Sequence, residues 1–266
     1  MKKSGGSLRH LRREVAPQFW SIRKKDFAWT IKPAPGSHPI IRSIPLGIVL
    51  RDILKYTSTI RETRKILAER KVHVDGKVVT DYKFPVGFMD VLYLRGPEEY
   101  FRVLPHPSKF FMFHRISAEE ANLKPLRIQK KTIVKNNYIQ LTFHDGRNYA
   151  IKNIELSSKQ PYETYDTVLM HLGTKQIIDS VKMATGSIAC VIDGRNVGFT
   201  GTIQSIQQTF KRSRAVVTLG RGDDTVRTIL KYVFVVGKEN PLITLPTDQE
   251  LKTWEELFKF KYTSLL

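Results

Sequence analysis

The sequence predicts a mostly β protein of the α+β class that consists of several domains. Its 266 residues exceed what one small module needs. Residues 72–79 alternate around the pair Asp75-Gly76, which predicts a β-hairpin with a tight turn. Glycines between β-branched runs in residues 186–203 predict sharp corners of a small barrel, where side chains would block the bends.

The charge of the chain points to a polyanionic partner. Lys and Arg number 44 against 25 Asp and Glu, which gives a net charge of +19. Such an excess weakens a compact fold by self-repulsion unless a polyanion neutralises it, and nucleic acid is the usual one. The longest apolar run, residues 44–54, contains Pro45 and Arg51 and cannot span a bilayer, so we expect no membrane. The start is basic without a following apolar stretch, which favours the cytoplasm, and the single Cys190 excludes a disulfide framework and a thiolate-rich zinc site.

Residues 1–42 form a basic and aromatic extension. Its prolines exclude a long helix or a central strand. Interleaved cations and rings suit a segment that threads into RNA, and a solvated tail is an equally weighted alternative from composition alone. The candidate RNA-binding residues here are Lys2, Lys3, Arg9, His10, Arg12, Arg13, Trp20, Arg23, Lys24, Lys25, Lys32 and Arg42.

Residues 43–105 predict two helices and a hairpin. Pro45 can begin the first helix, and Thr59 with Glu62 reads as a capping box for the second. This order resembles the small RNA-binding module first named for bacterial ribosomal protein S-four, and the resemblance implies that the second helix and the hairpin face RNA. Arg70 stands where many members of that family carry Gly. The candidate RNA-binding residues are Arg51, Arg61, Arg64, Lys65, Arg70, Lys71 and Lys77.

The rest of the chain predicts β domains and a short tail. Residues 106–180 predict a central β domain with strands over 131–134, 138–143 and 149–154. Within residues 181–240, the glycine-rich string resembles a KOW motif of an SH3-like barrel, with Phe199 where related sequences often have Arg, and strands are expected over 216–219 and 228–236. The motif residues are Gly194, Arg195, Asn196, Gly198 and Gly201.

Residues 241–266 predict a tail with an amphipathic helix. Thr247 to Glu250 would cap the helix, and its apolar stripe comprises Leu251, Trp254, Leu257 and Phe258. Packing on its own protein is the preferred interpretation, and a neighbouring protein is the alternative.

The order of parts resembles the e-type small-subunit ribosomal protein four family of archaea and eukaryotes, with strings closer to the archaeal branch. The resemblance implies binding to small-subunit ribosomal RNA (rRNA) beside other ribosomal proteins, in a cytoplasmic ribosome, by a protein that is not an enzyme. It implies no cofactor, metal or small-molecule substrate and no homo-oligomer. The tail departs from the family because it is acidic where basic residues are usual, so we do not assign it to RNA. The strings that carry the resemblance are His10-Leu11-Arg12-Arg13, Gly87-Phe88-Met89-Asp90-Val91, His114-Arg115-Ile116 and Phe234-Val235-Val236-Gly237-Lys238.

An RNA-modifying enzyme, a tRNA synthetase and a transcription factor are the alternative functions for a chain with these parts. A pseudouridine synthase can carry the same module, but the Arg-Leu-Asp string typical of those enzymes is absent, and residues 145–147 and 193–195 read as Asp-Gly turns. A tRNA synthetase would need a Gly-rich phosphate loop, and the histidines lack the paired spacing of metal ligands. A KOW transcription elongation factor is the other alternative, although it needs neither the extension nor the S-four-type module.

Overall fold

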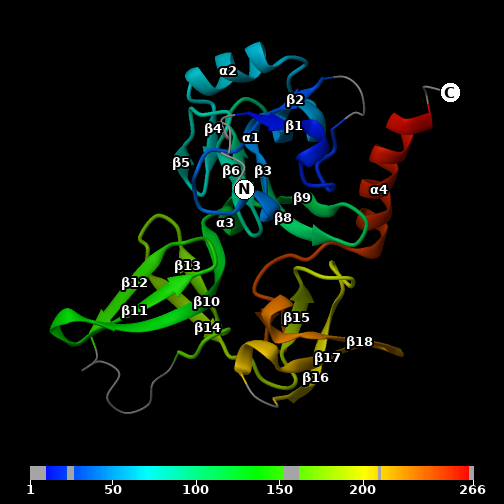
Figure 1. Cartoon of the computed structure of the whole chain (residues 1–266). Coiled ribbons are helices and arrows are strands. Elements are labelled where there is room, and N and C mark those ends of the chain that lie inside the picture. Colours follow the sequence, from blue (N-terminus) through cyan, green and yellow to red (C-terminus); the bar gives the residue numbers. More distant parts are fainter. Residues whose placement is uncertain (1–9, 23–26, 153–161, 209–210, 264–266) are drawn as a thin grey trace, which may run out of the picture. The chain divides into compact units, whose positions relative to one another are not determined.

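The chain folds into two units, residues 1–99 and 100–266. A computed structural model describes residues 10–22, 27–152, 162–208 and 211–263 (Figure 1). The N-terminal unit contains β1 (Leu11–Arg12), β2 (Trp29–Thr30), β3 (Ser43–Pro45), α1 (Leu46–Ile48), η3 (Val49–Ile53), α2 (Ile60–Ala68), β4 (Val72–Val74), β5 (Lys77–Val78), β6 (Pro85–Gly87) and β7 (Val91–Leu94). Short 3₁₀ turns cover Arg13–Val15 and Ile40–Arg42.

The first predicted helix forms, but it is short and partly of the π type. Pro45 is extended, with φ −61° and ψ 136°, and belongs to β3, so it precedes the helix and is not its first residue. The π-helical turn η3 follows α1 directly. Leu46, Ile48 and Leu50 are fully enclosed, so burial of this apolar face stabilises the segment.

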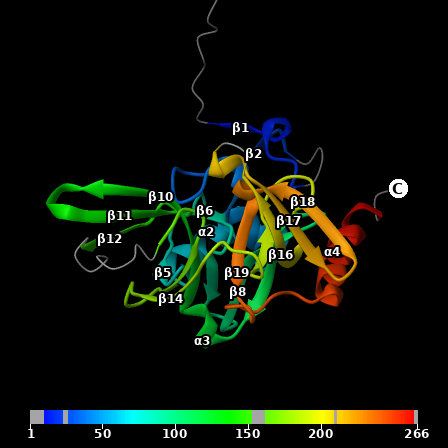
Figure 2. The same cartoon turned by 90° about the horizontal axis from the view of Figure 1, so that it is seen from below.

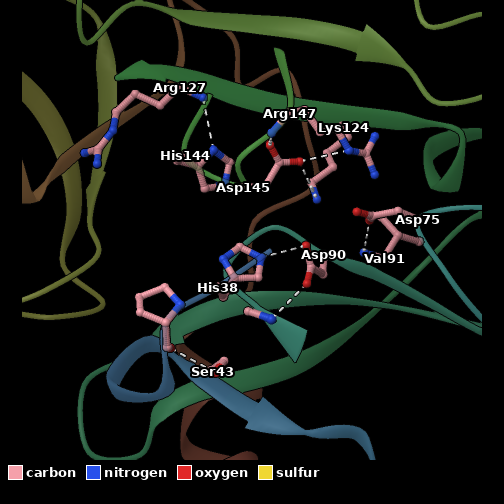
Figure 3. A network of polar contacts seen from close by, with 12 residues as sticks. His38, Ser43, Asp75, Asp90, Val91, Lys124, Arg127, His144, Asp145 and Arg147 are labelled. Atoms are coloured by element: carbon pink, nitrogen blue, oxygen red, sulfur yellow. Dashed lines mark hydrogen bonds and ion pairs between the residues drawn. The ribbon is translucent and has the colours of Figure 1, made fainter. Parts of the chain in front are cut away.

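A buried contact between His38 and Asp90 links the segment before β3 to the turn after β6. His38 Nε2 lies 3.1 Å from Asp90 Oδ1, and Asp90 Oδ2 accepts a hydrogen bond of 2.8 Å from the amide of Gly87 (Figure 3). A Cβ at Gly87 would lie 2.3 Å from His38 Cγ, so only glycine allows the imidazole to reach the carboxylate.

The C-terminal unit is almost entirely antiparallel β structure. It contains β8 (Glu99–His106), β9 (Phe110–Ile116), α3 (Ala118–Ala121), β10 (Leu123–Val134), β11 (Tyr138–Phe143), β12 (Asn148–Lys152), β13 (Thr167–His171), β14 (Ile177–Val181), β15 (Ile188–Val191), β16 (Thr200–Gln207), β17 (Val216–Arg221), β18 (Asp224–Ile229), β19 (Val233–Gly237) and α4 (Asp248–Thr263). Short 3₁₀ turns cover Lys135–Asn137, Arg212–Arg214 and Leu230–Tyr232.

Two five-stranded sheets organise this unit, with strand orders β12-β11-β10-β13-β14 and β18-β17-β16-β15-β19. The first buries Leu126, Ile128, Leu141 and Val168 on one face. The second is a half-barrel whose core includes Val217 and ten further buried side chains of residues 181–235, as expected for the KOW region. The mostly β, α+β class expected from the sequence is therefore confirmed.

The predicted strands differ from the observed ones at several places. The strand expected over 131–134 is the end of the longer β10, Leu123–Val134. The single strand expected over 228–236 is wrong, because a 3₁₀ turn at Leu230–Tyr232 separates β18 from β19. This break lets β18 pair with β17 while β19 pairs with β15. In addition, the sequence did not predict the long hairpin of β8 and β9. In this hairpin the paired residues run from Tyr100 opposite Ile116 to His106 opposite Phe110.

The C-terminal helix α4 packs on its own unit through the part whose side chains are described. Thr247 and Glu250 form the expected cap, in which the Glu250 carboxylate accepts from the Thr247 amide at 2.7 Å. The ring of Trp254 lies 6.3 Å from that of Phe113, and His106 Nε2 lies 3.1 Å from the carbonyl oxygen of Leu251. Leu257 and Phe258 lie outside the described side chains.

Among the described residues of the C-terminal unit, the buried cations are Arg102, Lys124 and Arg127. Lys124 Nζ lies 3.3 Å from Asp145 Oδ2, and Arg147 Nε lies 3.1 Å from the same oxygen (Figure 3). Arg127 donates to the carbonyl oxygens of Lys231 and Val233, and Arg102 donates to those of Glu120 and Leu123. Paired in this way, the buried charges hold neighbouring elements together at fixed positions.

The Lys124–Asp145 pair predicts a pH-dependent stability. Burial alone raises the pKa of Asp145, but the charge of Lys124 opposes it and the net pKa lies below the ordinary value. The pair therefore stabilises the fold above the unfolded pKa of an aspartate, about 3.9, and this contribution is lost as the pH falls through the folded pKa. Asp145→Asn should lower the free energy of unfolding by about 3–5 kcal/mol at neutral pH, measured by urea denaturation, because Lys124 is left buried without its counter-charge.

The matched control replaces both partners. Lys124→Met with Asp145→Leu should recover much of the lost stability, because no uncompensated charge is then buried. Equal unfolding free energies for the wild type and Asp145→Asn would show that the charge of Asp145 does not stabilise the buried Lys124.

Candidate nucleic-acid interface

Helix α2 presents a row of exposed cations on a rigid backbone. The Glu62 amide donates to Thr59 Oγ1 at 3.2 Å and the Glu62 carboxylate accepts from the Thr59 amide at 3.4 Å, so the predicted capping box is confirmed. Thr63 and Leu67 are buried beneath the helix. The cations on the opposite side are exposed, and they are Arg61, Arg64 and Lys65.

Arg64 is oriented by an aromatic neighbour. Its guanidinium carbon lies 4.4 Å from the ring centroid of Tyr82, and NH2 donates to the Tyr82 hydroxyl at 2.9 Å. This contact restricts the rotamers of Arg64 and leaves the side chain exposed, which lowers the entropy that is lost when it binds a phosphate.

Arg70 ends the helix in a conformation that favours glycine. Its φ is 55°, and it follows the C-cap Glu69. The amide of Lys71 donates to the Ile66 carbonyl at 3.4 Å and that of Arg70 to Leu67 at 3.0 Å, the pattern of a Schellman motif. The backbone path is therefore the one a glycine would take, and the chain keeps a cation there at a cost in strain of roughly 1 kcal/mol.

Lys71 and Lys77 extend the cationic surface into the hairpin. Lys71 forms an exposed ion pair with Glu69 at 2.6 Å, and this hydrogen bond and charge lower the pKa of the Glu69 carboxyl. An exposed pair contributes little stability, so a phosphate can displace Glu69 from Lys71. Lys77 is exposed beside the predicted turn.

The turn between β4 and β5 is rigid because two hydrogen bonds join it to Val91 at the start of β7. Asp75 and Gly76 have φ values of 52° and 75°, which confirms the expected tight turn. The Val91 amide donates to Asp75 Oδ1 at 3.0 Å, and the Asp75 amide donates to the Val91 carbonyl at 2.8 Å (Figure 3). Lys77 thus projects from a fixed backbone.

The described part of the N-terminal extension is a small folded element. Strands β1 and β2 pair, and the exposed Trp29 has His10 at 5.6 Å between ring centroids and the Arg12 guanidinium at 5.9 Å from its ring. Arg12 and Trp29 are directly opposite in the register, so one cation and one aromatic ring share a face.

Other predicted residues of this unit have internal partners. Trp20 is 4% exposed and its Nε1 donates to the Ser43 carbonyl at 2.9 Å, so it anchors the extension and has no free ring face for a base. Arg13 donates to the Ile22 carbonyl, and Arg51 binds the carboxylate of Asp52. Lys32 and Arg42 are half-buried. The predicted residues that lie outside the described residues are Lys2, Lys3, Arg9, Arg23, Lys24 and Lys25.

The KOW-like loop is shaped by glycines, as its spacing predicted. Gly194 and Gly198 have φ values of 91° and 84°. A Cβ at Gly201 would lie 2.5 Å from the carbonyl oxygen of Gly220, so the two strands approach closely there. Phe199 packs against the half-barrel core while Arg195 is exposed, so the exposed cation of this loop is Arg195. Asn196 is half-buried.

The aspartates that could suggest an enzyme, Asp145 and Asp193, form contacts that stabilise the fold. Asp145 is paired with Lys124, and Asp193 Oδ1 accepts from the Gly194 amide at 2.8 Å in a turn. Cys190 lines a pocket of about 240 Å³ together with Leu104 and Arg221, but burial raises the pKa of its thiol to about 12. Across the parts of the chain that the structure describes, no cluster of metal ligands occurs and no helix is long and apolar enough to cross a membrane.

Sequence reasoning overlooked the outer side of β10, β11 and β12. Lys130, Tyr138 and Lys152 lie there. Residues 121–144 contain no Asp or Glu, and this local excess of positive charge could have indicated the surface from the sequence.

Three family models match the chain. The family described as "Ribosomal family S4e" matches residues 97–177, the RS4NT domain matches residues 5–40, and the S4 domain matches residues 48–92.

Relatives and a solved structure agree with these matches. Proteins named small ribosomal subunit protein eS4 are 44% identical in Aeropyrum pernix, over 92% of this chain and 98% of the relative, and 45% identical in Ignicoccus hospitalis with the same coverage. The crystal structure of the 30S ribosomal protein S4e from Thermoplasma acidophilum superposes with a TM-score of 0.63 at 31% identity, over 74% of this chain and 96% of that one.

The strain at Arg70 gives a prediction that separates stability from charge. Arg70→Gly should raise the free energy of unfolding by roughly 1 kcal/mol, because glycine adopts φ 55° without a Cβ penalty. Arg70→Ala is the matched control, since it removes the same charge but keeps the Cβ. Denaturant titration of both variants measures the difference, and equal stabilities would show that the conformation at residue 70 is not strained.

Proposed function

The chain belongs to the ribosomal protein family S4e, and from this membership and its rigid basic surfaces we propose that it is a structural, RNA-binding constituent of the small ribosomal subunit. In this role it binds folded small-subunit rRNA beside other ribosomal proteins, supports subunit assembly, and is located in the ribosomes of the cytoplasm. It performs no catalysis and acts as a single copy.

The observation that supports RNA binding best is the surface formed by α2, the Arg70 cap and the hairpin. We call this set the module surface, and it consists of Arg61, Arg64, Lys65, Arg70, Lys71 and Lys77. All six side chains are exposed and stand on capped or tightly turned backbone. A-form RNA hides its base edges in a deep major groove, so fixed cations recognise the positions of phosphates, and the release of counterions supplies the free energy.

The remaining sequence-derived regions have supporting roles in this proposal. The extension, residues 1–42, contributes His10, Arg12 and the cations outside the described residues. Residues 43–105 carry the module surface, 106–180 the central β domain, 181–240 the KOW region with Arg195, and 241–266 the acidic tail. The acidic first turn of α4, Asp248 and Glu250, favours a protein contact over an RNA contact for the tail.

Association with ribosomal particles tests the proposed function. The protein should co-migrate with small subunits in stoichiometric amount in a sucrose gradient and should survive a high-salt wash, because a structural constituent is enclosed by RNA. Salt-labile, substoichiometric association, or recovery in light fractions, would instead indicate a modification enzyme or a transcription factor.

Reversal of the α2 cations tests the module surface. The triple variant Arg61→Glu, Arg64→Glu and Lys65→Glu should weaken binding to small-subunit rRNA by roughly a hundredfold or more at physiological salt, because phosphate contacts become repulsive. Filter binding across a salt series measures the affinity, and circular dichroism checks that α2 remains folded.

The control for this variant has the same change in net charge elsewhere. Lys175→Glu, Lys231→Glu and Lys238→Glu alter three exposed lysines of the C-terminal unit. A uniform loss in both variants would mean that only net charge matters, and the module surface would then be rejected.

A further inference from the structure

The three strands β10, β11 and β12 run side by side as an extended ribbon with two different faces (Figure 1 and Figure 2). Lys131 is opposite Leu141 and Ile133 is opposite Ile139, so these residues share the face that carries the core. Lys131 Nζ accordingly reaches the Tyr162 carbonyl at 3.2 Å, on the core side.

The other face is formed by the alternate residues and carries no buried side chain. The register places Val134, Tyr138 and Lys152 in one row across the three strands. A second row contains Lys130, Thr142 and Asn148. We call this the outer face, and its members are Lys130, Thr132, Val134, Tyr138, Gln140, Thr142, Asn148, Ala150 and Lys152.

The outer face is positive and has no acidic member. Lys130 and Lys152 are exposed, and Lys135 is exposed in the turn that joins β10 to β11. Tyr138 is half-buried and is the one aromatic residue of the face. Its cross-strand neighbour is Lys152, at a separation of about 5 Å between Cβ atoms for such pairs.

The face is also held rigid by its own hydrogen bonds. Gln140 Nε2 and Thr142 Oγ1 both donate to Asn148 Oδ1, at 3.1 Å and 2.8 Å. Behind it, Ile139 and Leu141 are buried in the sheet core. A rigid polar surface loses little conformational entropy when a ligand covers it.

From this combination we infer that the outer face of β10–β12 is a second rRNA-binding surface, on which Tyr138 stacks with an unpaired base and Lys130, Lys135 and Lys152 bind the adjacent phosphates. An aromatic ring on the open face of a sheet with cations beside it is how several RNA-binding sheets hold single-stranded nucleotides. An acidic protein segment would satisfy the lysines but would leave the solvent-accessible part of the Tyr138 ring without a stacking partner. This inference rests on the proposed function and adds a site to it.

The test measures binding of the full-length chain to small-subunit rRNA over a range of salt concentrations. Tyr138→Ala should reduce affinity roughly tenfold, because the stacking partner is lost, while Tyr138→Phe retains the ring and should keep it. The triple variant Lys130→Gln, Lys135→Gln and Lys152→Gln should make the slope of log affinity against log salt shallower by about 2, which corresponds to roughly three lost phosphate contacts.

Two controls isolate the outer face. Lys175→Gln changes an exposed lysine in the turn between β13 and β14 of the same sheet, and it should leave affinity and slope unchanged. Thermal unfolding of each variant confirms that the sheet is intact.

The outcomes separate this inference from the function on which it rests. If the outer-face variants bind rRNA like the wild type while the α2 reversal abolishes binding, the inference is wrong and the proposed function stands. If the lysine variants keep rRNA affinity but fail to enter subunits, the face binds a protein neighbour and the RNA assignment is overturned. If neither the outer-face variants nor the α2 reversal changes rRNA affinity, and random RNA binds equally well, both the inference and the proposed function are wrong.

Discussion

Repulsion among the cations is the constraint on which this structure depends. A chain with a net charge of +19 must keep most of its positive groups apart and in water. In a low-dielectric interior, the repulsion between two unpaired cations would be stronger than in water. The chain meets this constraint in two ways. Lys124 is enclosed with Asp145, and Arg127 with backbone carbonyls, so these two buried cations have partners. The exposed cations stand on separate surfaces.

The exposed cations of α2, of the β4–β5 hairpin and of the outer face stand on rigid backbone. The capping box holds α2, paired hydrogen bonds hold the turn at Asp75, and the Asn148 network stiffens the outer face. A cation on a flexible tail neutralises a phosphate equally well but loses more freedom in doing so. Rigid presentation also makes the spacing of the charges specific, and RNA recognised through its shape requires such spacing.

The features that sequence predicted best are local ones. The Thr59–Glu62 cap and the Asp75-Gly76 turn depend on neighbours within a few residues, so the pattern alone determined them. Trp20 shows the limit, because its burial depends on the Ser43 carbonyl, a partner distant in sequence. The same reason explains why Lys124 could not be recognised as buried. The strand expected over 138–143 matches β11, whereas its partners β10 and β12 could not be identified from the residues of that strand alone.

Arg70 shows how the demands of fold and function compete at one position. The Schellman motif requires positive φ, which glycine provides without cost, yet the chain carries arginine there. The strain is tolerable because the cap is also held by the buried Leu67 and by the start of β4. A cation at this junction lies between those of α2 and those of the hairpin, so it joins two groups of charges into one continuous surface. Contacts on one connected surface bind a polyanion together, and each one formed raises the effective concentration of the next.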